Sequence, residues 1–494
     1  MTEVSATQTT TSSAAASHLA QSDCSSKKYS PSRFNARATA PDGSLILYNA
    51  YSGHCCVISS SAAQHAKQLL SARGFEGGLG GLGQYLLKAG YLVEAGVDEA
   101  MIWDVAYAAR HYRNDSLSLI VLPSEECNFR CTYCSQLFER GTMAPHIRAA
   151  FRRFISAQVP KLRSLWIGWF GGEPLLGYDA IQELAPFIQD EARDHQVCYA
   201  SHITTNGYLL TPERVHNLLK WGILDYQVTL DGLPEVHDTT RPLKEGGPTF
   251  ARIMANLVGM RQCSERFKMR VRINFDRDNM SSLERFFDFL RDQLGSDRRF
   301  LIAFNPVSKW GGDNDDRLNV FTDEVLACQA ILRDQARRAS LPIESAMCRA
   351  KAGNFLCHAT LAGGFVIGAD GRLMKCTNFG VMPKEINVIG QLLDDGTVDL
   401  DRTRNLRWIV PFYNYDSKCK KCFYLPVCRG GIICPAARVK GFQPVCPQER
   451  LHIRSLLLEY WKERLATDGG KQLRVHAILA ESRDLPLARF SAAD

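Results

Sequence analysis

The sequence predicts an α/β protein whose central unit is an open, partial barrel of six βα repeats. Between residues 117 and 304, apolar runs alternate with amphipathic segments, which is the pattern of a parallel sheet with crossover helices. Six units are too few for the eight of a closed barrel, so we expect a partial (β/α)6 barrel over residues 117–340. The predicted strands are Leu117–Leu122, Leu165–Phe170, Cys198–Thr204, Tyr226–Leu230, Met269–Phe275 and Phe300–Phe304.

Residues before this alternation predict a smaller unit. Residues 1–40 are rich in Ser, Thr and Ala and poor in bulky apolar residues, so we expect a disordered lead. Residues 41–112 predict a small α+β domain, with strands near 45–49 and 54–58 and helices near 61–71 and 82–88. This unit loosely resembles the winged-helix peptide-recognition modules of enzymes that modify ribosomally made peptides. The alternative is a structural cap on the barrel.

One barrel helix is marked at both ends by its sequence. Thr211 is a good N-cap, Pro212 suits the first helical position, and Gly222 follows the last turn. These signals predict a helix over 211–221 between the third and fourth strands.

Length and composition fit a cytoplasmic globular protein. The 494 residues are 45% hydrophobic and 22% charged, which is enough for two or three domains with full cores. No apolar run approaches the length that crosses a bilayer. The net charge of +7 is modest and its charges are interspersed, so we expect neither nucleic acid nor membrane as a partner.

Three cysteines follow the first predicted strand with the spacing Cys127-x3-Cys131-x2-Cys134. Such a loop can wrap one cubane iron–sulfur cluster, but a four-iron cubane needs four ligands and no fourth cysteine lies nearby. One iron would therefore stay open to another molecule. A zinc site short of one ligand, or simple buried thiols, are the alternatives.

With Tyr133 directly before the last cysteine, this run resembles the signature of radical S-adenosylmethionine (radical SAM) enzymes. The resemblance implies that Cys127, Cys131 and Cys134 are the catalytic cluster ligands and that the open iron binds S-adenosylmethionine. The reduced cluster would then cleave this cosubstrate to methionine and a 5′-deoxyadenosyl radical, which removes a hydrogen atom from the substrate.

Further polar motifs follow the later strands, at the edge of the sheet where such sites are built. The run Gly171-Gly172-Glu173-Pro174 resembles the family's GGEP motif, which implies that Glu173 holds the methionyl amine of the cosubstrate. By the same resemblance, Thr205, Asn206 and Asp231 line its ribose and carboxylate pocket, with Asn274 and Arg272 as looser candidates. Tyr133, Gly171 and Gly172 complete the predicted cofactor-binding set. Each motif could instead be an ordinary strand-end turn.

A second group of cysteines lies within residues 345–450, after the alternation has ended. Too little apolar sequence separates them to form a core, so bound metal is expected to hold this region together. The eight cysteines equal the ligands of two cubanes, and zinc-ribbon sites are the alternative. They are Cys348, Cys357, Cys376, Cys419, Cys422, Cys428, Cys434 and Cys446.

This pattern resembles the SPASM extension of peptide-modifying radical SAM enzymes. The resemblance implies one auxiliary 4Fe-4S cluster on Cys357, Cys376 and Cys434, with Cys348 as a possible fourth ligand. A second would take Cys419, Cys422, Cys428 and Cys446. The gap between Cys428 and Cys434 is five residues where the family has three, which puts the geometry at Cys434 in doubt. Residues 451–494 predict a packed helix and a tail.

Together these motifs predict an enzyme that oxidises a peptide or protein side chain. The first hypothesis is a maturase that forms a thioether, carbon–carbon or carbon–oxygen crosslink in a ribosomally made precursor peptide, with flavodoxin or ferredoxin as electron donor. The second is an anaerobic sulfatase maturase, which makes formylglycine. That family has Asp after the G-x4-C cysteine, where this chain has Thr377. A non-catalytic iron–sulfur or zinc scaffold is a third hypothesis, from another class.

Overall fold

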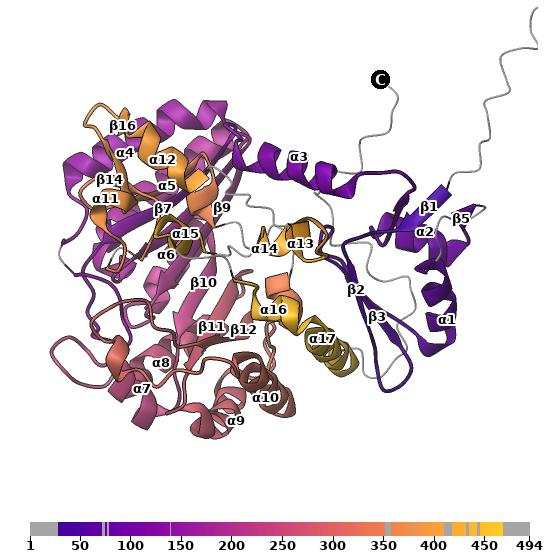
Figure 1. Ribbon diagram of the computed structural model, residues 1–494. Helices are drawn as coiled ribbons and strands as arrows, with labels where there is room; N and C mark the ends of the chain where they lie inside the picture. Colours follow the sequence, from indigo (N-terminus) through magenta and orange to yellow (C-terminus); the bar gives the residue numbers. More distant parts are fainter. Residues whose placement is uncertain are drawn as a thin grey trace, which may run out of the picture.

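The computed structural model describes residues 28–467, except 72–74, 77–78, 139, 351–356, 379, 410–416, 431–433 and 442–444. Its centre is the predicted set of six parallel strands, which lie side by side in chain order (Figure 1). All six predicted strands are confirmed, with ends that differ by a few residues. They are β7 (Ser116–Ser124), β8 (Ser164–Gly171), β9 (Cys198–Thr205), β10 (Ile223–Thr229), β11 (Lys268–Phe275) and β12 (Phe300–Pro306).

Helices connect these strands and pack against one face of the sheet. Alternate strand residues such as Leu119, Ile167 and Ile203 are fully buried and share one core cluster with the helices. The predicted helix after the third strand is confirmed, with the Thr211 side chain accepting from the Arg214 backbone N–H. The helices are α4 (Pro145–Gln158), α5 (Tyr178–Asp194), α6 (Pro212–Lys220), α7 (Pro234–Thr240), α8 (Phe250–Arg261), α9 (Leu283–Leu294) and α10 (Val325–Arg338).

The second cysteine region extends the same sheet beyond β7. Strand β13 (Gly364–Ile367) pairs parallel to β7, and β14 (Arg372–Met374), β15 (Val388–Leu392) and β16 (Val398–Leu400) follow as antiparallel neighbours. This part of the chain is therefore joined to the barrel by backbone hydrogen bonds. Its helices are α11 (Lys384–Asn387), α12 (Arg402–Ile409), α13 (Ser417–Lys420), α14 (Leu425–Cys428), α15 (Pro435–Val439) and α16 (Gln448–Leu451).

The N-terminal unit begins earlier than the sequence predicts. Residues 28–39 were expected in the disordered lead, but they form β1 (Lys28–Pro31) and β2 (Asn35–Thr39), which pair with strands outside the lead. Hydrogen bonds to neighbouring strands order residues 28–39, although these residues have few bulky apolar side chains. Residues 1–27 lie outside the described part of the chain. The other elements are β3 (Leu45–Asn49), β4 (Cys55–Ile58), α1 (Ser60–Leu69), β5 (Phe75–Glu76), α2 (Gly81–Lys88), β6 (Leu92–Glu94) and α3 (Glu99–His111).

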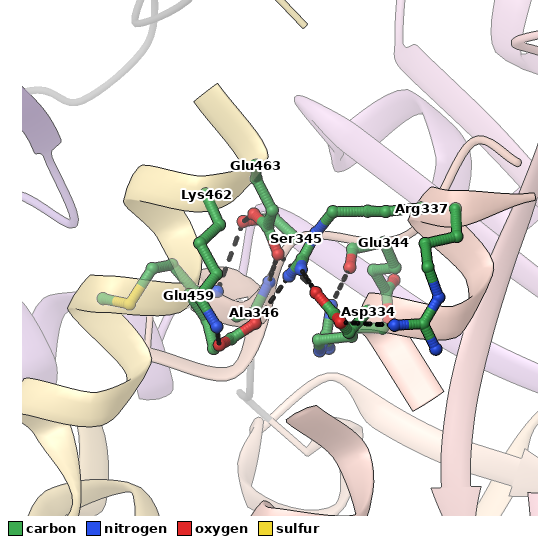
Figure 2. Close-up of polar contacts among 11 residues, drawn as sticks. Asp334, Arg337, Glu344, Ser345, Ala346, Glu459, Lys462 and Glu463 are labelled. Atoms are coloured by element: carbon green, nitrogen blue, oxygen red, sulfur yellow. Dashed lines mark hydrogen bonds and ion pairs between the residues drawn. The ribbon is translucent and has the colours of Figure 1, made fainter. Parts of the chain in front are cut away.

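Helix α17 (Ile453–Thr467) joins the N-terminal unit to the rest of the molecule. Its Leu456 and Leu457 share a buried cluster with Ile46 and Tyr48 of β3 and with residues 346–350. On its other side, Glu459 and Glu463 form ion pairs with Arg337 and Arg333 of α10 (Figure 2). Across the described residues, no helix is both long enough and apolar enough to span a membrane.

Candidate active site at the C-terminal edge of the barrel

The three cysteines after β7 lie together in the loop that follows the strand. Burial is the main reason that the pKa of the Cys127 thiol is raised to about 12, and the nearby Glu173, Cys131 and Cys134 raise it further. Burial likewise raises the Cys131 pKa to about 11. Three adjacent buried thiols become thiolates only when a cation compensates their charge, as a metal does. Among the described residues, no three His, Cys, Asp or Glu side chains converge closely enough to hold a single metal ion.

Two glycines allow the loop to pack directly on the end of β8. A Cβ atom on Gly171, whose φ is +140°, would lie 2.0 Å from the Ser124 carbonyl oxygen, and one on Gly172 would lie 2.4 Å from that of Glu126. The backbone N–H groups of Gly172 and Glu173 donate to these same carbonyls. In the structure, the Gly-Gly pair thus serves contact between backbones, so larger residues here would displace the cysteine loop.

Glu173 is fully buried, and both of its carboxylate oxygens accept hydrogen bonds within the protein. Oε1 accepts from the Thr205 hydroxyl at 2.7 Å and the Leu175 N–H at 3.0 Å, and Oε2 accepts from the Asn206 N–H at 2.7 Å. Burial raises the Glu173 pKa despite these bonds. These contacts fix the C-terminal end of β9 beside the loop, and the expected contact of Glu173 with an amine stays a prediction.

Asn206 links β9 to the cysteine loop. Its Nδ2 donates to Oδ1 of Asn128 at 2.8 Å and lies 3.9 Å from Sγ of Cys127. Its Oδ1 accepts from the Tyr208 N–H. The predicted site residues Glu173, Thr205 and Asn206 therefore form one bonded group around Cys127.

Tyr133 is the centre of a second group, formed with the ends of β10 and β11. Its hydroxyl donates to Oδ2 of Asp231 at 2.6 Å and accepts from Arg241 at 2.6 Å and Asn274 at 2.8 Å. Arg272 donates to the Asn274 side chain. Burial is the main cause that raises the Asp231 pKa, whereas the Arg241 charge lowers it. The structure thus brings the predicted residues Tyr133, Asp231 and Asn274 together around one hydroxyl.

Three polar atoms beside this group have no hydrogen-bond partner among the described residues. They are Oδ1 of Asp231, Nε of Arg241 and Nε2 of His237, all in buried side chains. Such atoms are costly when unsatisfied, so their accumulation next to three thiols indicates a polar ligand. The Asp231 oxygen can accept from a hydroxyl or amine, the Arg241 nitrogen can donate to a carboxylate, and the His237 ring adds a further polar nitrogen. S-adenosylmethionine has ribose hydroxyl, amine and carboxylate groups that match these atoms.

The cysteine loop also contacts the segment that follows the G-x4-C cysteine. Ser135 donates to Oδ1 of Asn378 at 2.8 Å, and Gln136 donates to the Thr377 carbonyl at 3.0 Å. Nearby, the buried Glu125 accepts two hydrogen bonds from Arg372 at 2.9 and 3.0 Å. The second cysteine region is thereby attached to the first, which the sequence spacing alone did not predict.

Two groups of auxiliary cysteines can be distinguished. Burial raises the pKa of Cys376 to about 12, and Cys357 and Cys434 raise it further, so these two thiols lie near Cys376. That the three hold one cluster stays a prediction. In the other group, Nε of Arg450 donates to Sγ of Cys422 at 3.3 Å. The pKa of Arg450 is raised first by that bond and also by the charges of Cys446 and Cys428.

Cys348 lies on the side of the second group. Its neighbours Ala346 and Met347 share a buried cluster with Tyr424 and Cys428, because residues 346–350 form a short 3-10 helix packed against α14 and α17. Burial is the main cause that raises the Tyr424 pKa, followed by Glu449, Cys428 and Cys348. The expected role of Cys348 as a possible fourth ligand beside Cys357, Cys376 and Cys434 stays a prediction.

Several contacts at the site involve residues outside the predicted set. Arg241, which follows α7, donates to the Tyr133 hydroxyl. Glu125 lies two residues before Cys127, outside the three-cysteine motif. Its partner Arg372 sits within the G-x4-C run, so opposite charges in or beside the two motifs were the available signal.

Comparisons with known proteins agree with this geometry. Residues 121–290 match the model of the Radical SAM superfamily. A cysteine-type anaerobic sulfatase-maturating enzyme of Clostridium novyi is 24% identical over 338 residues, 64% of this chain and 87% of that protein. A serine-type anaerobic sulfatase-maturating enzyme of Klebsiella aerogenes is 23% identical, over 63% of this chain and 77% of that protein.

A solved structure has the same fold at low sequence identity. It is native anSMEcpe with bound AdoMet and Cp18Cys peptide, with a TM-score of 0.53 and 17% identity, covering 72% of this chain and 99% of that one. The strand order and the family match together assign residues 121–290, which hold the cysteine loop at the sheet edge, to a radical SAM domain.

Proposed function

We propose that this chain is a radical SAM maturase that oxidises a side chain of a peptide or protein. The observation that carries the proposal is the Tyr133 group beside the three thiols, with unsatisfied atoms on Asp231, Arg241 and His237. In this proposal Cys127, Cys131 and Cys134 hold a 4Fe-4S cluster, which supplies the electron that cleaves S-adenosylmethionine.

The chain's own residues bind and orient the cosubstrate. Asp231 offers its free Oδ1 as an acceptor for a hydroxyl or amine, and Arg241 offers its free Nε–H to a carboxylate. Tyr133 keeps both in place, because its hydroxyl bonds to each of them. Glu173 and Asn206 hold the end of β9 against the loop that carries Cys127.

The second cysteine region would supply an electron acceptor for net oxidation. Cys357, Cys376 and Cys434 would hold one auxiliary cluster, and Cys419, Cys422, Cys428 and Cys446 another. The bonds from Ser135 to Asn378 and from Gln136 to Thr377 support this role, because they keep the two cysteine regions in contact.

Two products are compatible with this site. Crosslinking of a precursor peptide is favoured by Thr377, which stands where sulfatase maturases have the acidic residue proposed as base. Formylglycine formation is favoured by the sulfatase-maturating relatives, which this chain matches over more than three quarters of their length. The substrate in both cases is a side chain of a polypeptide.

The radical site is tested by anaerobic reconstitution, reduction with dithionite and measurement of 5′-deoxyadenosine. The wild-type chain should release it and the Cys131→Ala variant should not. Release by that variant would refute the assignment of the cluster loop.

The two possible products are distinguished by incubating the enzyme with a short peptide that contains one Cys and one Ser. A crosslink leaves the Cys sulfur in the peptide and creates no aldehyde, whereas formylglycine made from Cys loses the sulfur and reacts with a hydrazide probe. Mass spectrometry of the probe-treated peptide therefore distinguishes them. A peptide modified in neither way would contradict both products. It would not affect the assignment of the radical site, which the 5′-deoxyadenosine measurement tests separately.

A further inference from the structure

A completely buried lysine directly precedes one of the three cysteines of the first auxiliary group. Lys375 precedes Cys376 in sequence and has 0% of its surface exposed. Its Nζ donates to the carbonyl oxygens of Leu361 at 2.9 Å and Gly364 at 2.8 Å, and lies 5.0 Å from the centre of the Phe365 ring. An ammonium group has three donors, so two of them are used by these carbonyls.

The charge of this ammonium has no carboxylate partner. Among the described residues, no Asp or Glu forms an ion pair with Lys375, and its Nζ donates only to neutral carbonyls. The neighbouring His358 ring is buried and supplies no negative charge. A lysine is almost never buried completely unless an anion compensates it, because desolvation of an isolated ammonium is very costly.

The groups next to Lys375 that become anionic when they bind a cluster are the cysteines of the first auxiliary group. Burial lowers the pKa of Lys375 to about 7, and negative charge on the nearby Cys357 opposes this shift. Cys376 is the neighbour of Lys375 in the chain. Sγ of Cys376 already accepts from the Asn378 N–H at 3.4 Å. Positive charge and N–H donors close to cluster sulfurs favour the more negative, reduced cluster and so raise its reduction potential.

We infer that Lys375 is the buried counter-charge of the auxiliary cluster on Cys357, Cys376 and Cys434, and that it raises the reduction potential of that cluster. The inference rests on the proposed function, because it needs a cluster at these cysteines. The spacing of the cysteines does not predict this role. Lys375 would not touch the substrate, and its positive charge would act only on the cluster.

The test measures the reduction potential of the reconstituted full-length chain by redox titration with electron paramagnetic resonance. Lys375→Met removes the charge at similar volume, Lys375→Gln removes it but keeps amide donors, and Lys375→Arg keeps it. The matched control is Lys440→Met, because Lys440 also acts on Cys376 but is exposed to water, which screens its charge.

We expect one auxiliary signal to shift to lower potential in Lys375→Met and Lys375→Gln. A tenfold change in the reduction equilibrium is about 59 mV for a one-electron couple, and we expect at least this shift. Lys375→Arg and Lys440→Met should stay near the wild-type value. Iron retained by Lys375→Arg but lost from both uncharged variants would equally support the counter-charge.

Unchanged potentials in iron-loaded Lys375→Met or Lys375→Gln would overturn the inference, as would loss of iron from Lys375→Arg together with the uncharged variants. A different result would show that the proposed auxiliary cluster ligands are wrong. In that case the wild-type chain itself would give no auxiliary signal after reconstitution.

Discussion

The Tyr133 hydroxyl donates a 2.6 Å hydrogen bond to Oδ2 of Asp231, which joins the cysteine loop after β7 to the end of β10. The same hydroxyl accepts from Arg241 and Asn274. A residue inside the cysteine motif therefore organises two strand-end side chains and the arginine that follows α7, and this explains why an aromatic residue with a hydroxyl stands between Thr132 and Cys134.

Replacing Tyr133 by Phe should weaken binding of S-adenosylmethionine about tenfold or more. The change leaves the buried Asp231 and Arg241 without their shared partner, and hydrogen bonds to charged groups contribute about 1.5–3 kcal/mol. Equilibrium dialysis with the iron-loaded variant measures the dissociation constant. The control is Tyr226→Phe, which removes a buried hydroxyl with no hydrogen-bond partner among the described residues and should leave binding unchanged. Equal affinities in both variants would contradict the role of Tyr133.

The strands of the barrel were predictable because their signal is local. Leu165–Phe170 is an apolar run and Met269–Phe275 alternates apolar and polar residues, so both can be recognised without knowledge of their neighbours, and β8 and β11 contain them. Residues 28–39 gave no such signal, because β1 depends on pairing with the distant β5 and β6, and β2 has few bulky apolar residues of its own. Strand pairing is a tertiary property that a short window of sequence does not report.

The Glu173→Gln change should destabilise the fold by about 1–3 kcal/mol, because an amide offers only one acceptor where the carboxylate uses both oxygens. The amide NH2 would also oppose the donors on Thr205 or Asn206. Urea unfolding of the iron-free chain measures the change. Glu213→Gln, at an exposed position of α6, is the control and should have little effect. An unfolding midpoint for Glu173→Gln that equals the control would refute the structural role assigned to the carboxylate.

Removing Arg372 should cost about 3–5 kcal/mol of folding free energy, because Glu125 would remain as a buried charge without its main partner. Arg140 lies 4.0 Å from the Glu125 carboxylate and cannot replace the two bonds from Arg372. The double variant Glu125→Gln with Arg372→Leu should recover part of the loss. Chemical unfolding of the two single variants and the double variant gives the interaction energy, and simple additivity would show that the pair is not coupled.

The candidate site was predictable only in part, for a related reason. Motif resemblance gave Tyr133, Asp231 and Asn274, which the structure brings together. It did not give Arg241, which donates to the Tyr133 hydroxyl, because Arg241 follows α7 in a segment that carries none of the motifs. Nor did the sequence indicate that Ala346, Met347 and Ala350, on either side of Cys348, pack in one cluster with α17, because that packing joins segments far apart in the chain.

Stability should fall as the pH decreases below about 6.5 because of His237. Burial lowers the pKa of this ring to about 2, so the unfolded chain takes up a proton that the folded chain does not. The depressed folded-state value means that stability is complete above the ordinary pKa of 6.5 and is lost as the pH falls below it. From about pH 6.5 to about pH 5.5 the loss should be about 1 kcal/mol. The His237→Gln variant should lack this component, and an identical pH dependence in both proteins would exclude it.

Glu463 should control the short helix that carries Cys348, whereas its neighbour Glu459 should not. Glu463 accepts from the Ala346 N–H at 2.7 Å and the Ser345 hydroxyl at 2.8 Å, while Glu459 bonds to the side chains of Arg337 and Lys462 (Figure 2). The two carboxylates are about equally buried, so Glu463→Gln and Glu459→Gln are matched. Glu463→Gln should speed hydrogen exchange at the amide of Ala346 about fivefold or more, since loss of a hydrogen bond costs about 1 kcal/mol or more. Glu459→Gln should leave that rate unchanged, and equal rates in the two variants would mean that α17 holds this segment by apolar packing alone.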